Sequence, residues 1–166
     1  MRSSLGVGAL VLCAVAAFTG CHRPMNEGIA PASQLDSLVG IVSVTGTSFE
    51  QHVVLRVAGR AQAIVITSAD SASLSRVAGT EVVVRGRAEG DLFRVVSFTV
   101  RRVDGAPVAD GTLRREGGLF VLENAGGRSE IGNAPASFGS MIGARIWVGG
   151  PLDTGPNVYG VITPAR

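Results

Sequence analysis

Residues 74–86 (LSRVAGTEVVVRG) and residues 138–150 (FGSMIGARIWVGG) align without a gap. Gly79 coincides with Gly143, and the apolar residues on either side of these glycines coincide as well. In both stretches a segment with an apolar helical face ends at a glycine and continues into an alternating run rich in β-branched residues, which is typical of a short helix followed by a strand. The alignment predicts two copies of one structural unit in the chain.

Short valine-rich runs surround the first stretch. They alternate between apolar and polar residues and are separated by glycines, a pattern typical of an all-β domain. A short helix is expected between the third and fourth runs, with Asp70 as its cap and Gly79 at its end. The five expected strands are Leu38–Thr45, Phe49–Val57, Ala61–Thr67, Glu81–Arg87 and Leu92–Val103.

The order of three strands, one helix and two strands resembles the OB-fold, a five-stranded Greek-key barrel. The resemblance implies an all-β fold of two small OB-like barrels in tandem, over residues 38–104 and 108–163, each with one short helix. The second helix is expected near residues 136–142, and the third strand of the second copy, near residues 129–132, has a weak pattern. A single larger barrel or a β-sandwich is the alternative architecture.

The N-terminus carries a pattern for export. Its longest apolar stretch, Leu5–Phe18, is shorter than the about 20 residues that a membrane-spanning helix needs. Arg2 precedes this stretch and the small residues Thr19 and Gly20 follow it. Residues 1–20 therefore match a secretory signal peptide.

The end of this signal, Phe18-Thr19-Gly20-Cys21, resembles the lipobox of bacterial lipoproteins, with Phe18 where the family usually has an aliphatic residue. The resemblance implies that Cys21 is diacylated through its sulfur and that residues 21–37 form a flexible tether to a membrane. It also implies a place in the bacterial cell envelope outside the cytoplasm, periplasmic or on the cell surface. The alternative is ordinary cleavage after Ala14-Val15-Ala16, which leaves Cys21 as a free thiol.

Composition excludes several classes of protein. With 46% hydrophobic residues, 17% charged residues and a net charge of +2, the chain is neither a disordered segment nor a strongly basic nucleic-acid binder. Cys13 leaves with the signal peptide and Cys21 is the expected lipid site. We therefore expect no disulfide, no metal site and no cofactor in the mature domain.

Residues suited to catalysis are sparse. His22 lies in the expected tether, and His52 is expected on the outward face of the second strand, where Phe49, Val53 and Leu55 point inward. No stretch completes the G-x-S-x-G pattern of a hydrolase nucleophile. We therefore predict no catalytic residue and no enzymatic activity.

Arginine supplies every basic side chain of the first copy, because the chain contains no lysine. In an exported protein such side chains either attract anionic lipid headgroups or an acidic envelope polymer, or pair locally with Glu81, Glu89 and Asp91. A nucleic acid is not an expected partner. The arginines concerned are Arg56, Arg60, Arg85, Arg87, Arg94, Arg101 and Arg102.

Alternation along the fifth strand predicts Phe98 in the core and Val95 on the outer face. The offset between the two copies then places Ile162 in the core and Tyr159 on the outer face. These assignments determine which aromatic side chains of the second copy are available to a partner.

The same comparison predicts a partner surface on the second copy. Ile146 and Val148 are expected to point inward, so Trp147 and Arg145 point outward on the face that also carries Tyr159. Large aromatic residues beside an arginine are enriched in interface hot spots. The alternative is that the first barrel or the tether covers this face.

The sequence therefore predicts a membrane-anchored envelope lipoprotein that acts as a non-catalytic binding or protein-interaction module. An envelope protein or polysaccharide is the expected partner. An envelope oligosaccharide-binding protein is the alternative, and a hydrolase is a more distant one.

Overall fold

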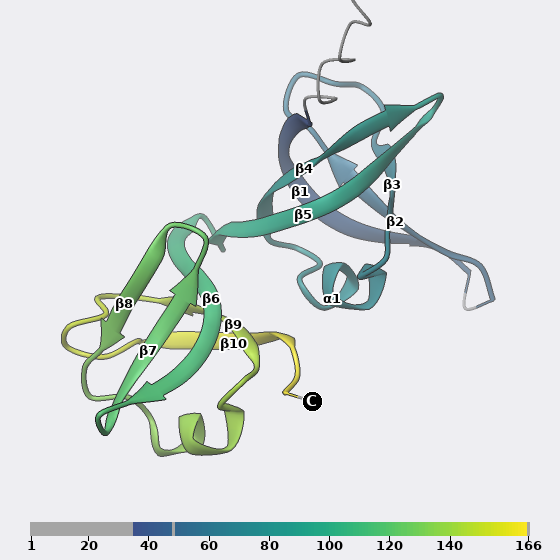
Figure 1. The fold of residues 1–166 in the computed structure, drawn as a ribbon. Helices are drawn as coiled ribbons and strands as arrows, with labels where there is room; N and C mark the ends of the chain where they lie inside the picture. Colours follow the sequence, from purple (N-terminus) through teal and green to yellow (C-terminus); the bar gives the residue numbers. More distant parts are fainter. Residues whose placement is uncertain (1–34, 48, 166) are drawn as a thin grey trace, which may run out of the picture. The chain divides into compact units, whose positions relative to one another are not determined.

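The computed structural model describes residues 35–47 and 49–165. The expected signal peptide, Cys21 and most of the expected tether lie outside these residues. The described part contains strands β1 (Asp36–Gly46), β2 (Gln51–Arg56), β3 (Ile64–Ser68), β4 (Glu81–Glu89), β5 (Leu92–Val103), β6 (Ala106–Glu116), β7 (Leu119–Asn124), β8 (Gly127–Ile131), β9 (Arg145–Gly149) and β10 (Val158–Thr163). Its helices are α1 (Ser71–Arg76) and a 3₁₀ helix, η1 (Ala136–Met141) (Figure 1). The all-β prediction is confirmed.

The first five strands pair in a closed cycle. β1 is antiparallel to both β2 and β4, β2 is antiparallel to β3, and β4 is antiparallel to β5. A parallel pairing between β3 and β5 completes the cycle. Helix α1 lies at one end of these strands, and the turn between β4 and β5 lies at the other (Figure 1). Leu74 and Val77 near α1 are each only 1% exposed, so the helix end closes the first core.

Side chains from all five strands and from α1 fill this first core. Burying each large aliphatic or aromatic side chain contributes about 1.5–3 kcal/mol to folding. The buried members are Val42, Val53, Leu55, Ile66, Leu74, Val77, Val82, Val84, Phe93, Val95, Phe98, Val100 and, from the second half of the chain, Ile162.

A bulge in β5 corrects the prediction for Val95. Val95 pairs with Gly86 while Ser97 pairs with Arg85, so Val96 has no opposite residue in β4. The extra residue reverses the alternation: Val95 and Phe98 are both buried, at 4% and 6% exposure, and Val96 is 63% exposed. Val95 therefore points into the core and not to the outer face. Gly86 permits the bulge, because a Cβ there would overlap the carbonyl oxygen of Arg94.

The prediction for Phe49 is also wrong. β2 begins only at Gln51, so Phe49 lies in the preceding loop and is fully exposed, at 100%. Gly46 ends β1 with a φ of 108°, and the chain returns to the sheet two residues after Phe49. Val53 and Leu55 are buried and His52 is exposed, as predicted.

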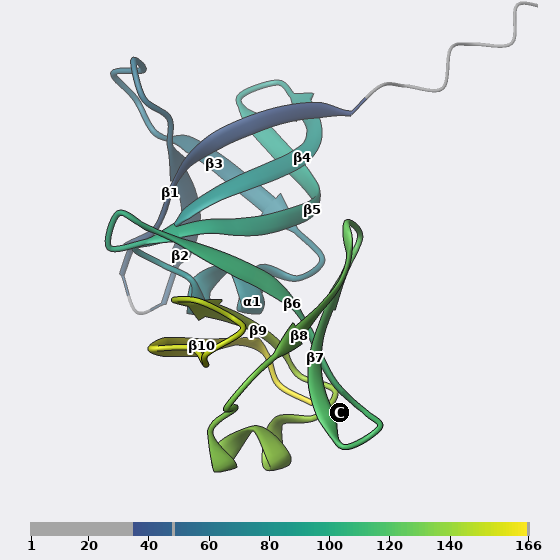
Figure 2. The same cartoon turned by 90° about the vertical axis from the view of Figure 1, so that its left-hand side faces the viewer.

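Strands β6–β10 repeat most of this pairing scheme. β6 is antiparallel to β7 and β9, β7 is antiparallel to β8, and β9 is antiparallel to β10 (Figure 2). Among the described residues β8 and β10 do not pair, although their counterparts β3 and β5 do. One backbone hydrogen bond, from Gly132 N to Leu152 O at 2.7 Å, links the end of β8 to the loop that precedes β10.

The aligned stretches make the same backbone contacts in both halves. Gly79 N donates to Val42 O, and Gly143 N donates to Leu113 O, each at 2.8 Å. The second core contains Leu113, Leu122, Ile131, Phe138, Ala144, Ile146 and Val148. The sequence alignment therefore corresponds to equivalent positions in space.

The second half of the chain also packs against the first core. β6 follows β5 through a turn in which Val103 pairs with Ala106. Ile162 of β10 is buried in the first core and Trp147 of β9 packs against that core. The hydroxyls of Ser73, on α1, and Thr163 lie 2.7 Å apart. The first core is therefore completed by side chains from β9 and β10.

Candidate functional site

The structure separates Tyr159 from the other two residues of the predicted partner surface, whereas Arg145 and Trp147 lie two residues apart on the same face of β9. Trp147 lies opposite Gly160 in the β9–β10 pair, whereas Tyr159 lies opposite Val148. Directly opposed residues point to the same face of a sheet, and successive residues point to opposite faces. Trp147 and Tyr159 therefore lie on opposite faces, which corrects the prediction that they share one external face.

Tyr159 packs against the edge of the second core and stays partly exposed. Its ring packs edge-on against Phe138, with centroids 5.1 Å apart and an angle of 87° between the rings. Its hydroxyl lies 2.8 Å from the Ser137 hydroxyl, and the residue is 38% exposed. The prediction for Tyr159 is wrong because it was derived from Val95. Val95 was placed on the outer face, and Tyr159 was placed there as its counterpart in the second copy.

Arg145 forms a partly buried ion pair with Asp110. Its Nε donates to Asp110 Oδ1 at 2.9 Å and its Nη2 donates to Asp110 Oδ2 at 2.6 Å. Nη2 also donates to the Phe98 carbonyl at 2.6 Å, and Cζ lies 4.4 Å from the centroid of the Phe98 ring. The side chain of Arg145 is 25% exposed and that of Asp110 only 2%. The bidentate geometry fixes the plane of the guanidinium.

Asp110 joins three strands. Its Oδ2 also accepts a hydrogen bond from Val100 N of β5 at 2.8 Å, while its partner Arg145 belongs to β9. The structural role of Asp110 depends on contacts with Val100 and Arg145, which lie 10 and 35 positions away in the sequence. No local sequence pattern reveals such contacts.

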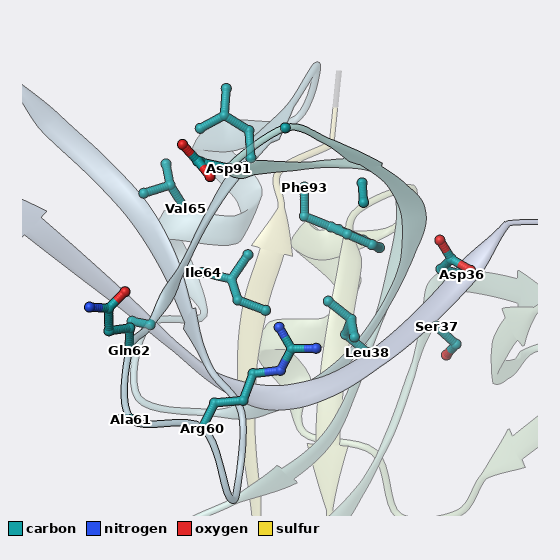
Figure 3. Close-up of a pocket in the computed structure, with 14 residues that line it drawn as sticks. Asp36, Ser37, Leu38, Arg60, Ala61, Gln62, Ile64, Val65, Asp91 and Phe93 are labelled. Carbon is teal, nitrogen blue, oxygen red and sulfur yellow. The ribbon is translucent and has the colours of Figure 1, made fainter.

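The larger concavity is a hollow of about 1190 Å³ in the first half, which we call the β3–β5 hollow. It is lined by the start of β1, the loop between β2 and β3, the beginning of β3 and the β4–β5 turn. Leu38, Ile64 and Phe93 supply apolar lining (Figure 3). Phe93 is itself only 3% exposed, so its ring belongs chiefly to the core.

Polar side chains of both charge signs surround the hollow. Figure 3 shows the Arg60 side chain reaching over it between Ile64 and Leu38, with Asp36 and Asp91 on other sides. Within the part of the chain that the structure describes, the side chains of Arg60, Asp36 and Asp91 make no ion pair. Their hydrogen-bonding capacity is therefore available to a ligand.

A second concavity, of about 650 Å³, lies between the outer face of β4 and β5 and the strands β6, β7 and β9. We call it the β5–β6 groove. The polar side chains that line it are Arg85, Ser97, Thr99, Arg101, Asp110, Thr112, Glu123, Asn124 and Arg145.

Several arginines of the first half pair locally. Arg94 binds Glu89 through two hydrogen bonds of 2.6 and 2.8 Å, and Arg102 Nη1 lies 3.5 Å from Glu81. The hydrogen bond from Arg94 lowers the pKa of the Glu89 carboxyl. Local pairing therefore accounts for part of the arginine set, but not for Arg60 or Arg85.

The described residues contain no group of three or more His, Cys, Asp or Glu side chains arranged to hold a metal ion. None of the helices in the described ranges is long and apolar enough to cross a membrane. Comparison of the chain with protein-family models, with curated proteins and with solved structures finds no match.

Proposed function

We propose that this chain is a lipid-anchored, non-catalytic binding module of the bacterial cell envelope, built from two tandem OB-like barrels. The pairing cycle of β1–β5 supports the barrel assignment of the first half, because it follows the order 1-2-3-5-4-1 with one helix between the third and fourth strands. The second half supports it through its equivalent pairings. In place of a pairing between β8 and β10, one hydrogen bond joins Gly132, just after β8, to Leu152 in the loop before β10.

The β3–β5 hollow carries the proposal of a binding function. OB-folds bind ligands with a strand face and with loops that include the one between the fourth and fifth strands. Here the β4–β5 turn lines the hollow together with β3. Pockets that combine an apolar lining with a few convergent polar groups are typical ligand sites.

The lining indicates the chemistry of the ligand. Arg60 donates hydrogen bonds, Asp36 and Asp91 accept them, and Gln62 does both. Leu38 and Ile64 add apolar contact. A short peptide segment, with its own donors, acceptors and apolar side chains, matches this combination best. A sugar ring is a poorer match, because Phe93 is 97% buried and presents little ring face for stacking.

Anchoring rests on the lipobox-like residues and is tested separately. The variant Cys21→Ser should leave the membrane fraction or stop its maturation. Unchanged fractionation and processing of this variant would contradict the lipoprotein assignment.

The binding function is tested with a photo-crosslinking amino acid at Gln62 in the intact, membrane-anchored protein. The matched control places the same group at Ser75, an exposed residue on α1 at the other end of the first barrel. We expect a discrete adduct from position 62 and none from position 75, with a peptide identified by mass spectrometry. A glycan adduct would favour the oligosaccharide-binding alternative, and equal labelling from both positions would contradict a site in the hollow.

A further inference from the structure

Three arginines from three different strands line the β5–β6 groove: Arg85 of β4, Arg101 of β5 and Arg145 of β9. The carboxylates that line the same groove already have partners. Asp110 is bound by Arg145, and Glu123 lies 3.1 Å from both Arg114 and Arg128. The groove therefore has a surplus of positive charge.

Arg85 and Arg101 supply this surplus. Among the residues that the structure describes, the Arg85 guanidinium makes no ion pair. Arg101 lies 4.0 Å from Glu81, a carboxylate that also serves Arg102 at 3.5 Å. Two guanidinium groups thus share one carboxylate.

Hydrogen bonds fix the Arg145 side chain and leave one of its nitrogens, Nη1, for a ligand. Its Nε and Nη2 donate to Asp110 and to the Phe98 carbonyl, and its Nη1 has no partner among the described residues. No buried side-chain nitrogen or oxygen in these residues lacks a hydrogen bond, so Nη1 reaches solvent. A guanidinium fixed in this way loses little conformational entropy when it binds a ligand.

Hydroxyl groups stand beside these arginines. Ser97 lies opposite Arg85 in the β4–β5 ladder, Thr99 is two residues further along the same face, and Thr112 lies opposite Arg145 in the β6–β9 ladder. Opposed residues of a ladder project to the same face. The groove therefore combines guanidinium and hydroxyl donors on both of its walls.

We propose that the β5–β6 groove binds a phosphate group through Arg85, Arg101 and the Nη1 group of Arg145. Phosphate presents several acceptor oxygens and receives paired hydrogen bonds from guanidinium groups. Its three or more oxygens also suit the neighbouring hydroxyls, which a two-oxygen carboxylate would leave partly unused. The phosphate source is either a soluble phosphate polymer or an anionic lipid headgroup. This site is separate from the β3–β5 hollow, so its failure leaves the proposed function untouched.

The test uses the chain with Cys21→Ser, so that no acyl chain contributes to binding. Calorimetric titration with tripolyphosphate is compared with flotation on vesicles of phosphatidylcholine with and without phosphatidylglycerol. Arg85→Gln and Arg101→Gln remove groove charges. Arg94→Gln is the control. It removes one positive charge from β5 outside the groove, at a residue that pairs with Glu89.

We expect Arg85→Gln and Arg101→Gln each to weaken binding by about tenfold, as for the loss of a hydrogen bond to a charged group, and Arg94→Gln to leave it nearly unchanged. If tripolyphosphate shows this pattern, a soluble phosphate is sufficient for binding. If only the vesicles with phosphatidylglycerol show it, the ligand is a lipid headgroup. Equal weakening by all three variants would show general charge attraction and overturn the proposal. Absence of binding to both probes would also overturn it.

Discussion

Gly40 and Gly111 occupy the same position in the two halves of the chain and are held there by the same contacts. A Cβ at Gly40 would lie 2.5 Å from the Arg56 carbonyl oxygen and 2.9 Å from Leu55 Cγ. A Cβ at Gly111 would lie 2.7 Å from the Glu123 carbonyl oxygen and 2.8 Å from Leu122 Cγ. The first strand of each half therefore crosses its neighbour too closely for any side chain.

The equivalence predicts matched effects of substitution. Gly40→Ala and Gly111→Ala should each lower the free energy of unfolding by about 1–3 kcal/mol, because the methyl group meets backbone that cannot yield without distorting the sheet. Gly139→Ala is the control, since nothing lies within 4 Å of its Cβ position. Denaturant unfolding of the three variants gives the measurement. A loss at only one of the two glycines would argue against equivalent strand crossings.

The ion pair of Asp110 with Arg145 predicts strong coupling. Asp110→Ala should destabilise the protein by about 3–5 kcal/mol, because it leaves a largely buried guanidinium without its carboxylate and leaves Val100 N without an acceptor. The double variant Asp110→Ala/Arg145→Ala should lose less than the sum of the two single variants. Additive losses in this double-mutant cycle would show that the two side chains act independently.

The bulge in β5 predicts opposite outcomes for two adjacent valines. Val95→Ala should cost about 2 kcal/mol, since it removes two buried methyl groups from the first core. Val96→Ala should have a much smaller effect, because this side chain is 63% exposed. Thermal and denaturant unfolding distinguish the two. Regular alternation without a bulge would place Val96, and not Val95, on the same face as Phe98. A larger loss for Val96→Ala than for Val95→Ala would therefore contradict the bulge.

Local patterns predicted much of the secondary structure because they report local physics. β5 spans Leu92–Val103 as expected, and η1 falls within the expected second helix. The ends of the two aligned helical segments could be predicted from Gly79 and Gly143. Both residues adopt positive φ values, 89° and 88°, which glycine tolerates best.

What could not be predicted depends on bulges and on distant contacts. The extra residue at Val96 reverses the side-chain alternation, and the error carried over to Tyr159 through the alignment. The partners of Asp110 belong to β5 and β9, which lie beside β6 only in the folded chain. The β3–β5 hollow likewise brings Asp36, Arg60 and Asp91 together from three separate segments. An alternation rule contains no information about these pairings.

Glu123 gives a prediction about pH. Hydrogen bonds from Arg114 and then from Arg128 lower the pKa of its carboxyl. A carboxyl whose pKa is lower in the folded than in the unfolded state stabilises the fold above its unfolded pKa, and this contribution disappears as the pH falls through the folded pKa. In a carbon-13 NMR titration, Arg114→Gln should raise the pKa of Glu123, and Arg128→Gln should raise it as well. A pKa that stays the same in both variants would contradict this account of the pair.

Trp147, the single tryptophan of the chain, reports on the packing of β9 against the first core. The indole covers Gly160, where a Cβ would lie 2.6 Å from Trp147 Nε1 and 2.7 Å from Cε2. Because the ring packs against the first core, its fluorescence should be blue-shifted and poorly quenched by acrylamide. Trp147→Ala should destabilise the protein by about 3–5 kcal/mol, the usual cost of truncating a packed aromatic side chain.

Gly160→Ala separates this packing from a role of Trp147 as an open partner surface. The added methyl group should displace the indole, so the emission should shift to the red, acrylamide quenching should increase and the thermal midpoint should fall. Val161→Ala is the adjacent control, because Val161 is 36% exposed and lies opposite Ile146 on the other face of the β9–β10 pair. If the emission of the parent protein were already that of a solvated indole, and Gly160→Ala changed neither spectrum nor stability, Trp147 would have to lie free of the first core.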